Sequence, residues 1–507
     1  MNQRIVQLSA GLLALGLLGQ GHAQSDPKPI TTCGNYNIIT QEKESDGLRE
    51  TRIILKGKTG TVATFTDAMG NVAWCKDITG DKIPEINISM FSGGAHCCFT
   101  QHVYSLTTPP RKILVADTAH SEMLEPKQLD GKGPLELISA EWRFAYAFGM
   151  SFAESIALPE VYSFVNGQYL VNTRAFPKVL DGWFDVPEGA DSGSGGSSAV
   201  MSDVVTLILQ GKENRIDSYL QSVDPVSRKW INSYLPDIKD LLSTYGYMDY
   251  PKMAGIRPED ATYSLVAGPF TATNGKQVMS IVYGSPKNAY VKDGQMGLVL
   301  IDKTSKGFKV TPLGLTFPKP PKGSQEQGVY LSASIKRKNG LYDVVVSDDR
   351  SGSTRMTAYR TVNNKLVALQ DDPLVPAVQV LQDLYNLAAI NKKVLEKDVK
   401  RTPEQTANLM DRAKRIREQG RIWADWFDAP PEAMGAFYWN TIQVIKDTPQ
   451  EAQVYVTIDF AYTPQNPDDY PIAKRHGMTL TFKKEGTWKL ASLDLVSLLE
   501  SPYDEEE

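Results

Sequence analysis

The first 23 residues constrain the fold of this chain most, because they decide the compartment in which it folds. Arg4 supplies a positive charge, residues 5–18 are mostly apolar, and Gly21-His22-Ala23 places small residues where a signal peptidase cuts. We expect residues 1–23 to be a secretory signal peptide, with an N-terminal membrane anchor as the alternative. An exported protein folds in the periplasm or outside the cell, where disulfide bonds form.

The cysteines fit this compartment. All four of them, Cys33, Cys75, Cys97 and Cys98, precede residue 100. An even number of cysteines in an exported chain predicts disulfide bonds. A bond between adjacent cysteines strains the peptide that joins them, so we expect Cys97 and Cys98 to bond to Cys33 and Cys75. The sequence leaves open which cysteine bonds to which.

Composition excludes several classes of protein. A chain of 507 residues, 41% hydrophobic and 22% charged, is too long for one core and is typical of a globular protein of several domains. The 54 Lys and Arg residues against 59 Asp and Glu give a net charge of −5 without a basic stripe, so we expect no nucleic-acid partner. No second apolar run of about 20 residues follows the signal, so we expect no transmembrane segment after cleavage.

A Gly- and Ser-rich run divides the chain. Residues 188–198 (Glu-Gly-Ala-Asp-Ser-Gly-Ser-Gly-Gly-Ser-Ser) have no large apolar side chain and predict a flexible linker or a long surface loop. We expect seven segments: a signal peptide (1–23), a β-rich disulfide-containing domain (24–184), a linker (185–199), a helical segment (200–260), a β-rich domain (261–370), an α+β domain (371–497) and an acidic tail (498–507).

The first half is predicted to be rich in strands. Residues 86–90 alternate Ile, Asn, Ile, Ser and Met, which predicts a half-buried strand. Val161–Val165 and Gln168–Val171 flank Asn166-Gly167, which predicts a hairpin with a type I′ turn. The segment 203–244 predicts short helices that Pro225 and Pro236 break.

Strands and helices alternate in blocks in the second half. Apolar runs between turn residues predict antiparallel strands at Val278–Tyr283, Met296–Ile301, Val329–Ile335, Tyr342–Val346 and Met356–Thr361. Helices follow at Pro376–Lys392 and from the capping box Thr402-Pro-Glu-Gln405 to about Gln419, and then four more strands. The predicted class is mainly β with an α+β C-terminal domain: propeller-like or sandwich antiparallel sheets, then helices and a curved sheet.

Short repeats support blade-like units. Asp77-Ile-Thr-Gly-Asp-Lys-Ile-Pro-Glu-Ile86 aligns without a gap with Gln128-Leu-Asp-Gly-Lys-Gly-Pro-Leu-Glu-Leu137. Residues 102–106 and 160–164 share a Val-Tyr-Ser core, and residues 359–364 parallel residues 162–167. Units of about 50 residues are typical of propeller blades.

The first pair of segments resembles the FG-GAP or VCBS repeat of integrin-type β-propellers, in which an Asp-rich loop followed by Pro-Asp or Pro-Glu surrounds calcium. This resemblance implies calcium ligands at Asp77, Thr79, Asp81 and Glu85, with the weak affinity of extracellular modules. In the second copy Lys132 occupies a ligand position and repels a cation, so we expect no metal there. The alternative is that the loop needs Asp and Gly only for its tight turn.

The C-terminal order of helices followed by long strands, from about Pro373 to Leu493, resembles the NTF2-like fold. Enzymes of that family place an Asp and a His inside a cone, while many other members bind ligands without catalysis. The available residues here are Asp459 and His476, and alternation places Asp459 on the face opposite the apolar row Val454–Phe460.

Residues 91–102 hold the densest group of reactive side chains. On a continuous strand His96, Cys98 and His102 share one side, which suits copper or zinc. Thiols in an oxidising compartment form disulfides instead, and a disulfide sulfur is a poor metal ligand.

No nucleophile elbow, zinc-protease motif or phosphate loop occurs in the sequence. We therefore expect an exported bacterial cell-envelope binding or interaction protein, periplasmic or extracellular, with a polysaccharide or another envelope protein as its partner. Calcium is the only cofactor that the resemblance suggests. A secreted hydrolase with an unrecognised site and a metal-handling periplasmic protein are the alternatives.

Overall fold

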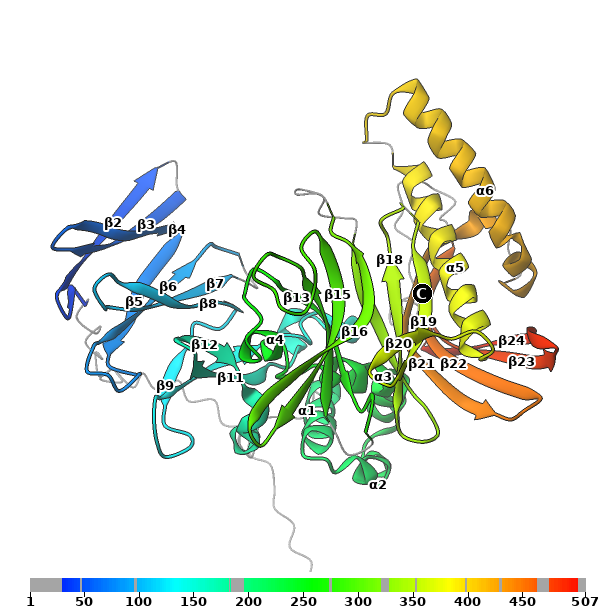
Figure 1. Ribbon diagram of the computed structural model, residues 1–507, viewed down its shortest axis with the longest axis horizontal. Helices are drawn as coiled ribbons and strands as arrows, with labels where there is room; N and C mark the ends of the chain where they lie inside the picture. Colours follow the sequence, from blue (N-terminus) through cyan, green and yellow to red (C-terminus); the bar gives the residue numbers. More distant parts are fainter. Residues whose placement is uncertain are drawn as a thin grey trace, which may run out of the picture.

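Six small sheets make up most of the molecule. The computed structural model describes residues 30–499 except 46–47, 95–97, 182, 184–195, 273–275, 321–327, 352, 397–398, 428–430 and 463–473. Its strands form six four-stranded antiparallel sheets, each in chain order. The first and last sheets lie at opposite ends of the molecule, so the sheets of the described chain do not close into a ring (Figure 1). The predicted mainly β class with helices in the C-terminal half is confirmed.

The first three sheets pack against one another in chain order. They contain β1 (Thr32–Cys33), β2 (Tyr36–Ser45), β3 (Leu48–Gly57) and β4 (Gly60–Asp67); β5 (Met69–Lys76), β6 (Glu85–Phe91), β7 (Phe99–Ser105) and β8 (Arg111–Ala119); and β9 (Glu125–Lys127), β10 (Glu136–Glu141), β11 (Leu158–Val165) and β12 (Gln168–Val171). The predicted hairpin is β11–β12, and positive φ at Asn166 and Gly167 confirms its turn.

Strand β6 differs from expectation. Ile86, Ile88 and Met90 pack against the first sheet, as alternation predicts. The opposite face is buried as well, because Asn87 and Ser89 lie beneath the third sheet. Gln101 of β7 accepts from the Asn87 amide nitrogen at 3.0 Å and donates to Ser89 at 3.0 Å, whereas the buried Asn87 Oδ1 has no partner among the described residues. The prediction of a half-buried strand was therefore wrong.

Helices fill the middle of the chain. They are η1 (Ala147–Gly149), η2 (Phe152–Glu154), η3 (Thr173–Ala175), η4 (Pro177–Leu180), α1 (Gly196–Leu209), η5 (Glu213–Arg215), α2 (Ile216–Gln221), α3 (Pro225–Ser243) and α4 (Tyr250–Met253). Pro225 occupies the first turn of α3, where Asp224 accepts from the Ser227 N–H at 2.9 Å. Pro236 lies inside α3 and does not break it, contrary to prediction, because contacts with neighbouring sheets hold the helix on both sides of it.

Two further sheets follow these helices. They contain β13 (Ala261–Gly268), β14 (Gln277–Tyr283), β15 (Gln295–Thr304) and β16 (Gly307–Pro318), and then β17 (Val329–Lys336), β18 (Tyr342–Asp348), β19 (Arg355–Val362) and β20 (Lys365–Ala368). They face each other across a shared apolar core. All five strands predicted in this region are present.

The last part contains α5 (Leu374–Leu395), α6 (Pro403–Phe427), η6 (Pro431–Ala433) and the sheet β21 (Met434–Asp447), β22 (Glu451–Tyr462), β23 (Lys474–Glu485) and β24 (Thr487–Leu499). The predicted capping box is present: Gln405 N–H donates to Thr402 Oγ1 at 3.2 Å, and Thr402 N–H donates to Gln405 Oε1 at 2.9 Å. None of the described helices is long and apolar enough to cross a bilayer.

The sequence repeats occupy equivalent places in different sheets. The aligned segments that begin at Asp77 and Gln128 form the loops before β6 and β10, the second strands of their sheets. Residues 162–167 and 359–364 form the third strand and final turn of two other equivalent hairpins, β11–β12 and β19–β20. The repeats therefore mark one four-stranded unit that recurs along the chain.

Helix α3 joins distant sheets. Arg475 of β23 forms an ion pair with Asp237 of α3, and each residue is 5% exposed. Thr457 also donates to Asp237 at 2.9 Å. At the C-terminal end of the helix Arg143 and Arg174 donate to the carbonyls of Leu241 (2.5 Å) and Leu242 (2.9 Å). These two arginines satisfy the last turn of α3, where a helix carries partial negative charge.

We expect Arg475→Met to lower the free energy of unfolding by about 3–5 kcal/mol, because Asp237 would remain buried without its cation. Urea denaturation of the whole chain measures the change. Adding Asp237→Leu to the same variant should recover part of the loss. Arg415→Met is the control, since its pair with Asp411 is exposed and contributes about 0–1 kcal/mol. Equal losses in Arg475→Met and the control would contradict the role given to this pair.

Candidate functional site

The structure corrects the predicted disulfide pairing. Cys33 of β1 is bonded to Cys75 of β5, with their Cα atoms 5.8 Å apart. The bond therefore links the first sheet to the second, and neither cysteine pairs with the Cys97-Cys98 segment as we had expected. Cys98 is also disulfide-bonded, while Cys97 lies outside the described residues. That Cys97 and Cys98 are neighbours in the sequence does not show which strands lie side by side where two sheets pack.

The predicted calcium loop is closed by its own backbone. Asp77 accepts from the N–H groups of Gly80 (2.7 Å) and Lys82 (2.9 Å). Asp81 accepts from the Ile83 N–H at 2.8 Å, in the same local pattern. The four predicted ligand side chains thus have a structural role as acceptors and donors within the turn.

Glu85 lies beneath this loop. Its carboxylate accepts from the N–H groups of Ile78 (2.9 Å) and Thr79 (3.3 Å) and from the Thr79 hydroxyl (3.4 Å). Burial raises the pKa of Glu85, while these hydrogen bonds oppose the shift. No group of three or more His, Cys, Asp or Glu side chains suited to a metal occurs among the described residues. Calcium at Asp77, Thr79, Asp81 and Glu85 therefore stays a prediction from sequence.

The second loop repeats the geometry without the same side chains. Gln128 accepts from the Gly131 N–H at 3.1 Å, and Glu136 accepts from the Leu129 N–H at 3.0 Å. Gly133 has φ +72° at the position where the first loop has Lys82 with φ +69°. The fold requires a left-handed residue at this place, and the first copy meets that requirement with a lysine.

The predicted metal triad falls partly outside the described chain, because His96 is not described. His102 lies on β7 with its ring centroid 4.8 Å from that of Phe65. Burial lowers the pKa of His102, and the nearby Lys112 lowers it further. Among the described residues, the His102 ring therefore packs as an aromatic side chain does.

The register of the last sheet separates the two residues suggested by the NTF2-like resemblance. Asp459 pairs with Arg475, whereas His476 pairs with Ile458. Directly paired residues share a face and successive residues alternate, so Asp459 and His476 point to opposite faces. Asp459 lies 3.1 Å from Arg475, and His476 packs its ring against Phe460 at 4.7 Å. The two side chains do not form a dyad.

A cavity of about 390 Å³ lies between β19, α5 and α6. Its polar wall comes from α5, where Gln379, Gln382, Asp383 and Asn386 stand at helical spacing on one side. The apolar residues of the same helix, such as Leu381 and Leu384, pack into the core beneath it. The helix was predicted from the sequence without this wall, although the regular spacing of these four polar residues was a signal that could have indicated it.

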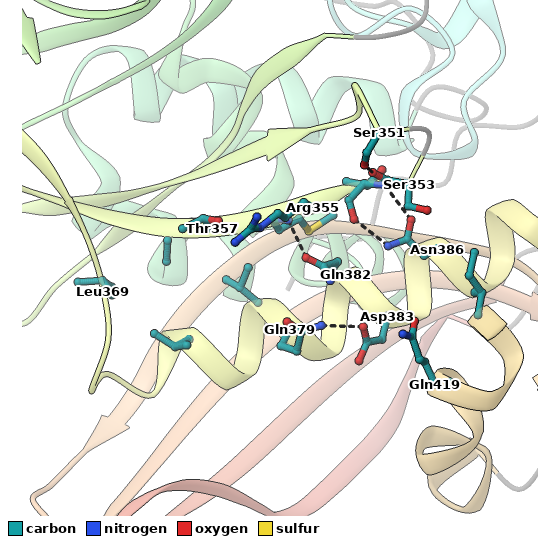
Figure 2. Close-up of a pocket in the computed structure, with 17 residues that line it drawn as sticks. Ser351, Ser353, Arg355, Thr357, Leu369, Gln379, Gln382, Asp383, Asn386 and Gln419 are labelled. Atoms are coloured by element: carbon teal, nitrogen blue, oxygen red, sulfur yellow. Dashed lines mark hydrogen bonds between the residues drawn. The ribbon is translucent and has the colours of Figure 1, made fainter. Parts of the chain in front are cut away.

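The cavity lies beside an incomplete sheet edge. Strand β20 pairs with β19 only from Tyr359 to Val362, so residues 355–358 pair with β18 on one side and have no strand partner on the other. Side chains of α5 take that place: Gln382 accepts from the Met356 N–H at 2.8 Å, and Asn386 exchanges two hydrogen bonds with the backbone of Thr354 at 2.9 and 2.7 Å. Figure 2 shows both amides reaching from α5 to the strand.

Asp383 is the only carboxylate that lines this cavity among the described residues. It accepts from Gln379 at 2.7 Å and from the Trp423 indole at 3.3 Å, and Figure 2 shows it beside Gln379 on the helix. Burial raises the pKa of Asp383, and these hydrogen bonds oppose that shift. Arg355 carries the only positive charge of the described lining. Apart from Arg355 and Asp383, the polar groups of this lining are neutral amides and hydroxyls.

A second cavity, of about 400 Å³, contains a titratable cluster between the second and third sheets and α4. Glu160 accepts a short hydrogen bond from Tyr162, and burial raises the pKa of Glu160 to about 7. Nearby Asp249 accepts from the Val171 N–H at 2.8 Å and pairs with Lys252 at 2.5 Å. Asp249 is therefore held in place as a structural acceptor, and the described lining has no histidine.

Comparison with known proteins gave no further constraint. No family model matches the chain, and neither a curated protein nor a solved structure matches it. The FG-GAP or VCBS and NTF2-like resemblances remain predictions from sequence.

We expect Lys82→Gly to raise the free energy of unfolding by about 0.5–1 kcal/mol, because glycine adopts positive φ without the steric cost that lysine bears. Lys132→Gly in the second loop is the control: Lys132 has no positive φ, so this variant should be neutral or destabilising. Thermal unfolding of both variants measures the difference. A stability gain shared by both variants would refute the explanation.

Glu160→Gln should raise the melting temperature at pH 8 and change it little at pH 4. The folded state raises the pKa of Glu160 from 4.5 to about 7, so the charged form is disfavoured in the fold. The resulting penalty is absent below pH 4.5 and grows until about pH 7, reaching about 1–3 kcal/mol. Glu125→Gln at an exposed position of β9 controls for the lost charge. An equal effect of Glu160→Gln at both pH values would contradict this assignment.

Proposed function

We propose that the protein is an exported binding protein of the bacterial cell envelope, periplasmic or extracellular, and that the cavity beside β19 binds a neutral glycan. The observation that carries this proposal is the polar part of the lining, which consists mostly of amides and hydroxyls. Sugar hydroxyls both donate and accept, so they pair well with Asn, Gln, Ser and Thr side chains.

Size and rigidity also favour a small polar ligand. A cavity of about 390 Å³ falls in the range that holds small molecules or one unit of a longer chain. Gln382 and Asn386 are fixed by the backbone of β19, and Asp383 is fixed by Gln379 and Trp423. A pre-organised wall lowers the entropy lost on binding.

The described lining favours binding over hydrolysis. General acid–base cleavage of a glycosidic bond normally uses two carboxyl groups, and Asp383 is the single carboxyl group along the described wall of this cavity. A secreted hydrolase is the second candidate, because Glu160 has the raised pKa of a general acid in another cavity.

Titration calorimetry of the mature chain with chitotriose, a neutral trisaccharide, tests the proposal. We expect saturable binding with a Kd below about 1 mM, weakened about tenfold by Asp383→Asn, which removes a charged acceptor, or by Gln379→Ala, which removes a polar partner. Asp411→Asn, an exposed change on α6, should leave the Kd unchanged.

Absence of saturable binding, or equal affinity in all three variants, would reject this cavity as a glycan site. Reducing ends released from chitotriose during a long incubation would favour the hydrolase instead. Glu160→Gln would then show whether that carboxyl group carries the reaction.

A further inference from the structure

A third cavity, of about 370 Å³, lies where the third sheet, α1, α4 and the fourth sheet meet. Three cations line it: Arg174 of η3, Lys276 just before β14, and Lys303 of β15. No Asp or Glu belongs to its described lining, and no ion pair within the described residues uses any of these three cations. Lys276 and Lys303 are exposed, so water screens their mutual repulsion, and the three positive charges make the cavity attractive to an anion.

The electrostatics agree with this geometry. Burial lowers the pKa of Arg174, and the tyrosines around it oppose that shift. Desolvation and the charge of Arg174 lower the pKa of Lys276. No carboxylate is among the groups that influence either residue.

The fold fixes Arg174 rigidly. Its Nε and Nη2 donate to the carbonyls of Tyr245 (2.7 Å) and Leu242 (2.9 Å) at the end of α3. The guanidinium also lies 5.3 Å from the ring of Tyr245 and 5.1 Å from that of Tyr247. Its Nη1 takes no part in these bonds, so part of its donor capacity is left for a ligand.

Two buried phenols add neutral donors. Tyr247 and Tyr250 are 4% and 3% exposed and both line the cavity. No hydrogen bond joins either hydroxyl to a described residue, and neither oxygen is a fully buried unsatisfied atom. Both hydroxyls are therefore free to donate to a ligand in place of water.

Most of the remaining lining is apolar. Phe176, Pro177, Val179, Leu180 and Leu209 form this part of the wall. An ion without an apolar group would leave this wall in contact with water.

We propose that this cavity binds a phosphate monoester with an apolar substituent, through Arg174, Lys276, Lys303 and the hydroxyls of Tyr247 and Tyr250. A carboxylate has two acceptor oxygens, whereas a phosphate monoester has three terminal oxygens and a charge near −2. Five donor groups around one cavity therefore suit the phosphate better. The apolar wall accommodates the substituent.

Titration calorimetry of the mature chain with phenyl phosphate tests this site, with inorganic phosphate and benzoate as comparison ligands. Phenyl phosphate should bind more tightly than either, and higher salt should weaken its binding. Lys276→Ala and Lys303→Ala should each weaken phenyl phosphate binding about tenfold, because each removes a positive charge. The double variant Tyr247→Phe with Tyr250→Phe should weaken it several-fold, because two hydroxyl donors are lost while the rings still pack. Lys309→Ala removes an exposed charge from the same sheet outside the cavity and should have no effect.

Each alternative result has a defined meaning. Equal binding of benzoate would overturn the assignment to phosphate, and equal binding of inorganic phosphate would overturn the apolar substituent. No saturable binding, or equal effects of Lys303→Ala and Lys309→Ala, would overturn the site itself. Chitotriose binding in the same variants keeps this test separate from the glycan proposal, since the two cavities share no lining residue.

Discussion

The buried ion pair between Arg475 and Asp237 is the interaction on which the assembly of the second half depends. Both charges leave water when β23 and α3 come together, which costs several kcal/mol unless each finds its partner with good geometry. Arg475 also donates to the Ser233 carbonyl at 3.1 Å and lies 4.3 Å from the ring of Tyr234. A displaced helix would leave these buried groups unpaired, so the pair selects one position for α3 on the last sheet.

Helix α3 transmits this constraint to the N-terminal sheets. Its C-terminal carbonyls accept from Arg143, which follows β10, and from Arg174, which follows β12. The helix is thus held at one end by the third sheet and at its middle by the sixth sheet, although the chain between these sheets is long. Apolar burial alone is non-directional and would not specify such a position.

The two proposed ligand sites use this framework in different ways. The Nε and Nη2 atoms of Arg174 stabilise the end of α3. The same residue lines the cavity that also contains Lys276 and Lys303. The cavity beside β19 depends on a different device, in which amides of α5 complete an unfinished strand edge. In both places a polar side chain that satisfies the backbone also provides a rigid wall for a ligand, which is how a binding site gains pre-organisation.

Local patterns predicted local structure well. The Asn166-Gly167 turn and the Thr402–Gln405 capping box were predicted correctly, because each is decided by residues a few positions apart. Pro236 was misjudged, because tertiary contacts keep α3 helical across a proline that would break an isolated helix. The polar side of β6 was misjudged as well, because alternation shows which residues share a face but not what covers it.

The sequence by itself determined the mainly β class of the fold, the Asn166-Gly167 hairpin and the capped start of α6, since these follow from periodicity, capping and turn chemistry over short stretches of chain. Only the tertiary structure decided that Cys33 pairs with Cys75, that Asp237 is buried and Glu160 partly buried, and that Arg174, Lys276 and Lys303 surround one cavity. Those features join residues far apart in the chain, and their proximity depends on how whole sheets and helices pack. No local pattern encodes that packing.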